Sequence, residues 1–204
     1  MFHFAAIATL ASASTFALAS CTGPSADTNS PAPSPTPSSA PPTSQTSAAP
    51  KKAYTAQGFL SKKLGELSGW DCTSDIESCS IKFTVEKIDV NPKCTTYGAP
   101  PASGRKTLLL HVSLTTGTLS QDGSYLAPTL FNPFSLKGLS QDGFVHDAKP
   151  GSCTDQQNML STTILPNSRY TGTVEVEVPD SATSVASAHE PTKDGGRGWV
   201  WAIV

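Results

Sequence analysis

The chain has 204 residues, with 14 Lys and Arg against 16 Asp and Glu and a formal net charge of −2 at pH 7. Only 15% of its residues are charged, and the basic ones are scattered along the sequence. Nucleic-acid binding needs a basic stripe or patch, so this composition excludes that class of partner.

The first 20 residues predict an export signal. They contain no Asp, Glu, Lys or Arg, and the apolar run from Phe4 to Ala19 is too short for a comfortable membrane span. The run ends in Leu18-Ala19-Ser20-Cys21, which resembles the lipobox of bacterial lipoproteins. We therefore expect residues 1–20 to be removed and Cys21 to carry a diacylglyceryl group. The alternative is a retained anchor helix, which fits less well because no polar residues flank the run.

Residues 21–53 predict a disordered tether. From Thr22 to Pro50 the sequence consists almost entirely of Ser, Thr, Pro and Ala, and Asp27 is its only charged residue. Such a segment has no large apolar side chains to bury, so the entropy cost of ordering it is not offset. Extended as polyproline, at about 3.1 Å per residue, it would reach roughly 90 Å. This length is typical of an anchor that crosses a cell wall, as in actinobacteria.

Residues 54–204 have the size of one domain and an all-β pattern. Three long strands are predicted, over Ser80–Val90, Lys106–Thr116 and Arg169–Pro179. In the third, Val176 shares the inward face with the neighbouring valines, while Glu175 lies on the opposite face, which the alternation predicts to be wet. In the first, the apolar residues stand at odd positions up to Val85 and at even positions from Ile88 onward. This change predicts a bulge near residues 86 and 87, which would keep the apolar side chains on one face.

Shorter strands are expected between turns rich in Gly, Pro, Asp and Asn, and no stretch shows helical periodicity. The pentapeptide Leu-Ser-Gln-Asp-Gly occurs twice, at 119–123 and 139–143, and we interpret both copies as tight turns. Together these elements predict an antiparallel β-sandwich. The shorter strands are Leu64–Gly69, Phe134–Leu139, Phe144–His146, Leu160–Leu165, Thr183–Ala188 and Gly198–Val204.

The remaining four cysteines form an even set in an exported chain, which predicts two disulfides. Three pairings are possible. We prefer Cys72 with Cys79 and Cys94 with Cys153, which on a loop-entropy model stabilise by about 2.5 and about 4 kcal/mol. A zinc site or a thiol redox pair would need a Cys-x-x-Cys motif, which the sequence lacks, so no metal or cofactor is expected.

The last strand is apolar on both faces. Trp199 and Trp201 alternate with Val200 and Ala202. One interpretation is a strand covered on both sides, with the outer face capped by the segment from Tyr54 to Leu60. The other is an exposed aromatic stripe, which makes Trp199 and Trp201 candidate binding residues for a partner or a glycan. Trp70 is expected to pack beside the Cys72 bridge.

No catalytic residues are predicted. The sequence contains no Gly-x-Ser-x-Gly elbow, His-Glu metalloprotease motif or phosphate-binding glycine loop. A Ser-His-Asp arrangement built from distant loops stays open as an alternative, with His111, His146 and His189 as the histidines of the folded part.

Several stretches together resemble one family; they are Ser80–Cys94, Lys106–Gly117, Asn132–Leu136 with Asp142-Gly143, and Leu165–Gly172 with Val178-Pro179. It is a bacterial extracellular domain of unknown function with an immunoglobulin-like β-sandwich, similar to a small immunogenic protein secreted by mycobacteria. The resemblance covers nearly all of Leu64–Val204 and implies no catalytic residues. Its most specific part runs from Pro166 to Pro179; members often have Gly where this chain has Asn167, and Asn tolerates the same left-handed backbone.

Taken together, the sequence predicts a lipid-anchored binding module on the outer face of the cytoplasmic membrane, without catalytic activity. Its partners would be the membrane, through the lipid, and an envelope protein or a cell-wall glycan. The alternatives are a hydrolase of envelope material that uses loop His, Asp and Ser residues, or a passive structural spacer.

Overall fold

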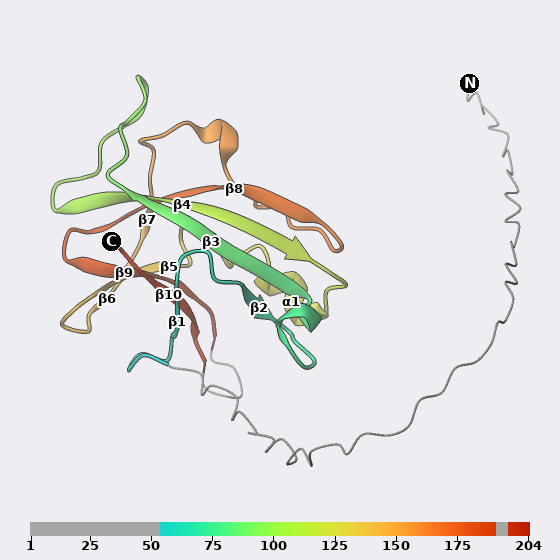
Figure 1. Ribbon diagram of the computed structural model, residues 1–204. Helices are drawn as coiled ribbons and strands as arrows, with labels where there is room; N and C mark the ends of the chain where they lie inside the picture. The colour runs from blue at the N-terminus through green and yellow to red at the C-terminus, as the bar shows by residue number, and fades with distance from the viewer. Residues whose placement is uncertain (1–53, 191–195) are drawn as a thin grey trace, which may run out of the picture. The chain divides into compact units, whose positions relative to one another are not determined.

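The computed structural model describes residues 54–190 and 196–204 (Figure 1). The expected signal peptide of residues 1–20, Cys21 and the tether up to residue 53 lie outside the described residues. Within the two described ranges, no helix is long and apolar enough to span a membrane.

The described residues form two packed five-stranded sheets, which confirms the predicted all-β sandwich (Figure 1). The long-strand sheet has the order β2-β3-β4-β8-β7, and the C-terminal sheet has the order β1-β10-β9-β5-β6. All pairs are antiparallel except β1 with β10. The strands are β1 Leu60–Lys62, β2 Ser68–Trp70, β3 Ile81–Val90, β4 Arg105–Thr116, β5 Leu136–Ser140, β6 Val145–Asp147, β7 Lys149–Pro150, β8 Arg169–Pro179, β9 Ala182–Ala188 and β10 Gly198–Ala202; the helices are η1 Ile76–Ser78, α1 Gln121–Leu126 and η2 Gln156–Asn158.

The three long strands lie where the apolar alternation places them. β8 has the predicted bounds, and β4 and β3 each differ by one residue at the start. The register between β3 and β4 shifts between Val85 and Lys87, so the predicted bulge is confirmed. The extra residue, Glu86, is exposed, and the bulge returns Ile88 to the buried face.

Some shorter elements differ from the predictions. Between Leu64 and Gly69 the chain turns at Gly65, whose φ is 78°, and only Ser68–Trp70 pairs as a strand. No strand forms over Leu160–Leu165; there, the Thr163 amide donates a 3.1 Å hydrogen bond to Ser161 Oγ. Ser and Thr side chains that bond nearby backbone groups favour turns over a ladder. The φ of Asn167 is 52°, which confirms the left-handed turn.

The two Leu-Ser-Gln-Asp-Gly copies adopt different conformations. At 139–143 the pentapeptide is the predicted turn between β5 and β6, with Gly143 at φ 90°. At 119–123 it starts α1 instead, because the Ser120 Oγ accepts a 3.1 Å hydrogen bond from the Gly123 amide and caps the helix. The prediction of two similar turns is therefore wrong for the first copy. The following residues decide: after the second copy the chain enters β6 at Val145, whereas after the first copy Ser124-Tyr125-Leu126 continues as a helix.

The structure joins Cys72 with Cys79 and Cys94 with Cys153, the same pairs that the sequence analysis preferred. The second bridge holds the loop after β3 against the loop before β8. The Ala99 amide supports the same contact by donating a 3.0 Å hydrogen bond to the Ser152 carbonyl.

The predicted wet environment of Glu175 is wrong. The residue points away from the core, as its parity requires, but it is only 2% exposed because the loop carrying Cys153 covers it. Its Oε1 accepts a hydrogen bond from the Cys153 amide, at 2.5 Å, and its Oε2 accepts bonds from the amide and hydroxyl of Thr154, at 2.8 and 2.5 Å. The carboxylate therefore fixes this loop on the sheet.

Candidate functional site: an aromatic groove beside the short helix

The candidate binding residues Trp199 and Trp201 lie in the core rather than on the surface. Trp199 is 5% exposed and Trp201 is 1% exposed, and both rings pack edge-on against Phe83 of the opposite sheet. The outer face of β10 is covered by Phe59, which packs with Val200 in a second apolar cluster. The exposed aromatic stripe is therefore wrong, and the alternative of a strand covered by residues 54–60 is confirmed.

The described part of the chain contains a hollow with a volume of about 1040 Å³. It lies at one end of the sandwich, between the edge strand β2 of the long-strand sheet and β10 of the C-terminal sheet, with α1 as a third wall. Figure 1 shows α1 close to β2 at this end of the molecule. We call this hollow the aromatic groove and define it by Trp70, Asp71, Asp122, Tyr125, His189, Glu190 and Trp199, which all line it.

Three rings form a row across the groove. The Trp70 and His189 ring centroids are 4.9 Å apart, and those of His189 and Trp199 are 5.2 Å apart, both with edge-to-face geometry. The row therefore links β2 of one sheet to β10 of the other. Aromatic pairs in this geometry contribute about 0.5–1.5 kcal/mol beyond the area that they bury, so the row stabilises the floor of the groove. The expected packing of Trp70 beside the Cys72 bridge stays a prediction.

His189 is held in one orientation. Its Nδ1 lies 2.6 Å from the Glu190 carbonyl oxygen, and its amide donates a 3.0 Å hydrogen bond to the Arg197 carbonyl. A carbonyl can only accept, so Nδ1 carries the proton. In the neutral ring, Nε2 is then the acceptor.

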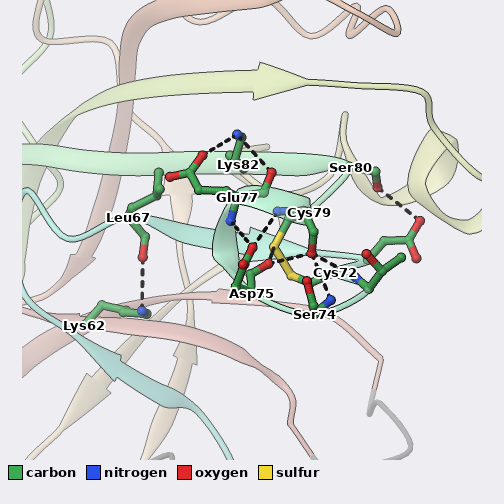
Figure 2. Close-up of a disulfide and its surroundings, with 12 residues drawn as sticks. Lys62, Leu67, Cys72, Ser74, Asp75, Glu77, Cys79, Ser80 and Lys82 are labelled. Atoms are coloured by element: carbon green, nitrogen blue, oxygen red, sulfur yellow. Dashed lines mark hydrogen bonds and ion pairs between the residues drawn. A yellow bond between two sulfur atoms is a disulfide. The ribbon is translucent and has the colours of Figure 1, made fainter. Parts of the chain in front are cut away.

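Cys72 lines the groove, and Figure 2 shows the loop that its bridge to Cys79 closes. Asp75 Oδ1 caps η1 by accepting 3.1 Å hydrogen bonds from the amides of Glu77 and Ser78. At the groove end, Asp71 has a φ of 56° and its carboxylate accepts a 3.1 Å hydrogen bond from the Ser80 hydroxyl. Gly69 is required beneath the bridge, because an added Cβ would lie 2.6 Å from Cys79 Sγ. These contacts fix where Trp70 and Asp71 lie.

Helix α1 supplies the opposite wall. Its cap at Ser120 sets where the helix begins, and the first turn carries Asp122, whose charge is favourable at a helix N-terminus. One turn later, Tyr125 is 70% exposed beside the hollow. An aromatic ring this exposed gains little from folding, so Tyr125 is available for contact with a ligand.

The groove is electronegative. Three carboxylates, those of Asp71, Asp122 and Glu190, line it, and its described lining contains no Lys or Arg. Within residues 54–190 and 196–204, no group of three or more His, Cys, Asp and Glu side chains is arranged to hold a metal ion.

The other histidines lie elsewhere. On the outer face of the long-strand sheet, His111 Nε2 lies 2.8 Å from Asp89 Oδ2, and Lys87 Nζ lies 2.6 Å from the other oxygen. His146 lies on the edge strand β6 beside the ring of Phe144. No hydrogen bond in the described residues joins a serine hydroxyl to His111, His146 or His189. The structure therefore does not bring the three histidines together in one site.

The Asp89 cluster gives a pH prediction. The Lys87 ammonium, and then His111, hold the pKa of Asp89 below its usual value of 3.8. A lowered pKa in the folded state means that the stabilisation is present above the unfolded pKa and is lost as the pH falls through the folded value. We expect Asp89→Asn to flatten the decline in stability between about pH 5 and about pH 3. Urea unfolding of both proteins at each pH measures this; identical slopes would contradict it.

Only part of the groove can be predicted from the sequence. Trp70, Trp199 and His189 each stand out in the sequence for separate reasons, whereas Asp71, Asp122, Tyr125 and Glu190 do not. The sequence offers one signal for helix α1. Ser120 is a residue type favoured at helix N-caps, and the amide that it caps belongs to Gly123, three positions later. The remaining wall residues come together only because strands far apart in the sequence end at the same side of the sandwich.

Comparison with known protein-family models found no match, and comparison with curated proteins found none either. Among solved structures, the chain is similar to a secreted protein of Mycobacterium tuberculosis, MPT63, with 14% identity and a TM-score of 0.39 over 71% of this chain and 98% of that one. It is also similar to an uncharacterized β-sandwich protein from Clostridium difficile 630, with 14% identity and a TM-score of 0.40 over 76% of this chain and all of that one.

Proposed function

We propose that this protein is a lipid-anchored binding module of the cell surface, and that the aromatic groove takes its ligand. The export signal and Cys21 would place the chain on the outer face of the cytoplasmic membrane. The tether of residues 21–53 would hold the sandwich away from the bilayer. The groove is the observation that supports ligand binding. It is concave, it is lined by aromatic residues, and it contains a few polar groups, as small-ligand sites generally do.

The groove favours binding over the two other functions. A passive spacer needs no hollow lined by Trp70, Tyr125 and three carboxylates. In a hydrolase of the Ser-His-Asp type, a carboxylate orients the histidine that acts as base. In the groove, the carbonyl of Glu190 orients His189 instead. We therefore propose a protein without catalytic activity.

The anchor is tested by Cys21→Ala. Two or three acyl chains on one cysteine would bury enough methylenes, at about 0.8 kcal/mol each, to hold the protein on a bilayer. We expect the wild-type protein in the detergent phase after phase partitioning and the variant in the aqueous phase. If both proteins partition between the two phases in the same way, the lipid anchor is contradicted.

The binding half is tested by crosslinking in living cells. A photoreactive phenylalanine analogue replaces Tyr125 in the groove or, as the control, Tyr97, which is 99% exposed and is not among the groove residues. We expect a discrete crosslinked product, to an envelope protein or to cell-wall glycan, from position 125 and none from position 97. Equal products from both positions, or none from either, would contradict a ligand in the groove.

A further inference from the structure

We propose that the ligand of the aromatic groove is a small organic cation, a molecule that carries ammonium groups on a ring or aliphatic body. This inference rests on the proposed function and adds the chemical class of the ligand. It is carried by the charge, the ring content and the size of the groove.

Charge is the first argument. The carboxylates of Asp122 and Glu190 have no hydrogen-bond or ion-pair partner among the described residues, and both residues line the groove. Asp71 adds a third negative charge, and its Oδ2 accepts only the neutral Ser80 hydroxyl. With no described Lys or Arg in the lining to neutralise them, these carboxylates attract a cation and repel an anion.

The rings give the second argument. Trp70 and Tyr125 border the same hollow as the carboxylates. The face of an aromatic ring is electrostatically negative, so it attracts an ammonium group, and Trp and Tyr are the strongest such partners. Rings together with carboxylates therefore select a positive group with an apolar body. A neutral molecule would gain from the rings alone and would leave the carboxylates desolvated and unpaired.

Size is the third argument. The volume of about 1040 Å³ lies at the upper end of small-molecule sites, which span roughly 300–1,000 Å³. A hollow of this size fits a ligand of a few rings, such as a short amino-sugar oligomer. The walls are fixed by the Cys72–Cys79 bridge and the capped helix, so little ordering is required on binding.

The test uses isothermal titration calorimetry with the complete exported chain carrying Cys21→Ser. The probes are the glucosamine tetramer, which is cationic, the N-acetylglucosamine tetramer, which has the same rings without the charge, and spermidine, which has the charge without the rings. We expect the cationic tetramer to bind about tenfold more tightly than the acetylated one, and spermidine to compete with it. Binding should weaken as added salt shortens the Debye length from about 10 Å to about 3 Å.

Two pairs of variants locate the binding. Asp122→Asn with Glu190→Gln should weaken the cationic tetramer by about tenfold, whereas Glu86→Gln, which removes an exposed charge on the β3 bulge, should not. Tyr125→Ala should weaken it by about threefold, and Tyr97→Ala should leave it unchanged. Fluorescence spectra of the tryptophans confirm that each variant is folded.

The outcomes separate this inference from the proposed function. Equal binding of both tetramers would overturn the cation inference and leave a groove that binds sugars. Binding of no probe, or binding of the cationic tetramer that the Asp122/Glu190 double variant does not weaken, would also overturn it. Failure of the crosslinking experiment at Tyr125 would instead remove the groove as the binding site.

Discussion

Val176→Asp should abolish the cooperative unfolding transition of the domain. Val176 lies on the interior strand β8, fully buried opposite Leu108 of β4. A carboxylate placed there has no partner, and burying an unpaired charge costs more than a typical domain stability of about 5–15 kcal/mol. Thermal unfolding followed by near-UV circular dichroism would show no transition in the variant.

The matched control is Thr171→Asp, an exposed position near the start of the same strand. It introduces the same side chain, and we expect it to change the stability by less than about 0.5 kcal/mol. Two variants with the same melting temperature would contradict the assigned faces of β8.

Glu175→Ala should lower the free energy of unfolding by about 3 kcal/mol. The substitution removes the acceptor of three hydrogen bonds and leaves the amides of Cys153 and Thr154 unsatisfied under a covered loop. Urea denaturation measures the loss, and Glu86→Ala, which removes an exposed glutamate, serves as the control with little expected change.

A double-mutant cycle identifies the interaction. Thr154→Val removes the hydroxyl that donates to Glu175 Oε2, so its effect should be smaller in the Glu175→Ala background than in the wild-type protein. A Glu175→Ala variant within a few tenths of a kcal/mol of the wild type would mean that the loop does not cover this carboxylate in solution.

The long strands could be predicted because a period of two leaves little choice. In β8, valines and polar residues alternate over the whole second half of the strand, and one face must be buried. The same alternation could not predict the burial of Glu175. Parity states which side of a sheet a residue occupies, but it does not state whether a loop closed by a disulfide lies over that side.

The groove could not be predicted from the sequence for a related reason. Its walls come from residues 70–72, from α1 and from the segments that flank the C-terminal strand, and no local pattern records that these meet. Helix α1 is too short, at six residues, to show a 3.6-residue period. The pentapeptide at 119–123, which leads into α1, also occurs as a turn at 139–143, so the context decides the conformation rather than the pentapeptide.

The C-terminal tryptophans show the opposite case, in which two interpretations followed from one pattern. A strand that is apolar on both faces is either covered twice or exposed for binding. The structure selects the first, because Phe59 covers the outer face and the opposite sheet covers the inner one. Trp199 still lines the groove, so the residue belongs to both the core and the candidate site.

The most direct test of the binding site uses the three tryptophans as reporters. Their indole N–H groups give separate signals in a ¹⁵N-correlated NMR spectrum, assigned by Trp→Phe variants. Soluble fragments of the digested cell envelope are added to the complete exported chain carrying Cys21→Ser. We expect the Trp70 signal to shift, the Trp199 signal to shift less, and the Trp201 signal, from a ring that is 1% exposed, to stay in place. A Trp70 signal that does not move while the fragments bind would contradict the aromatic groove as the ligand site.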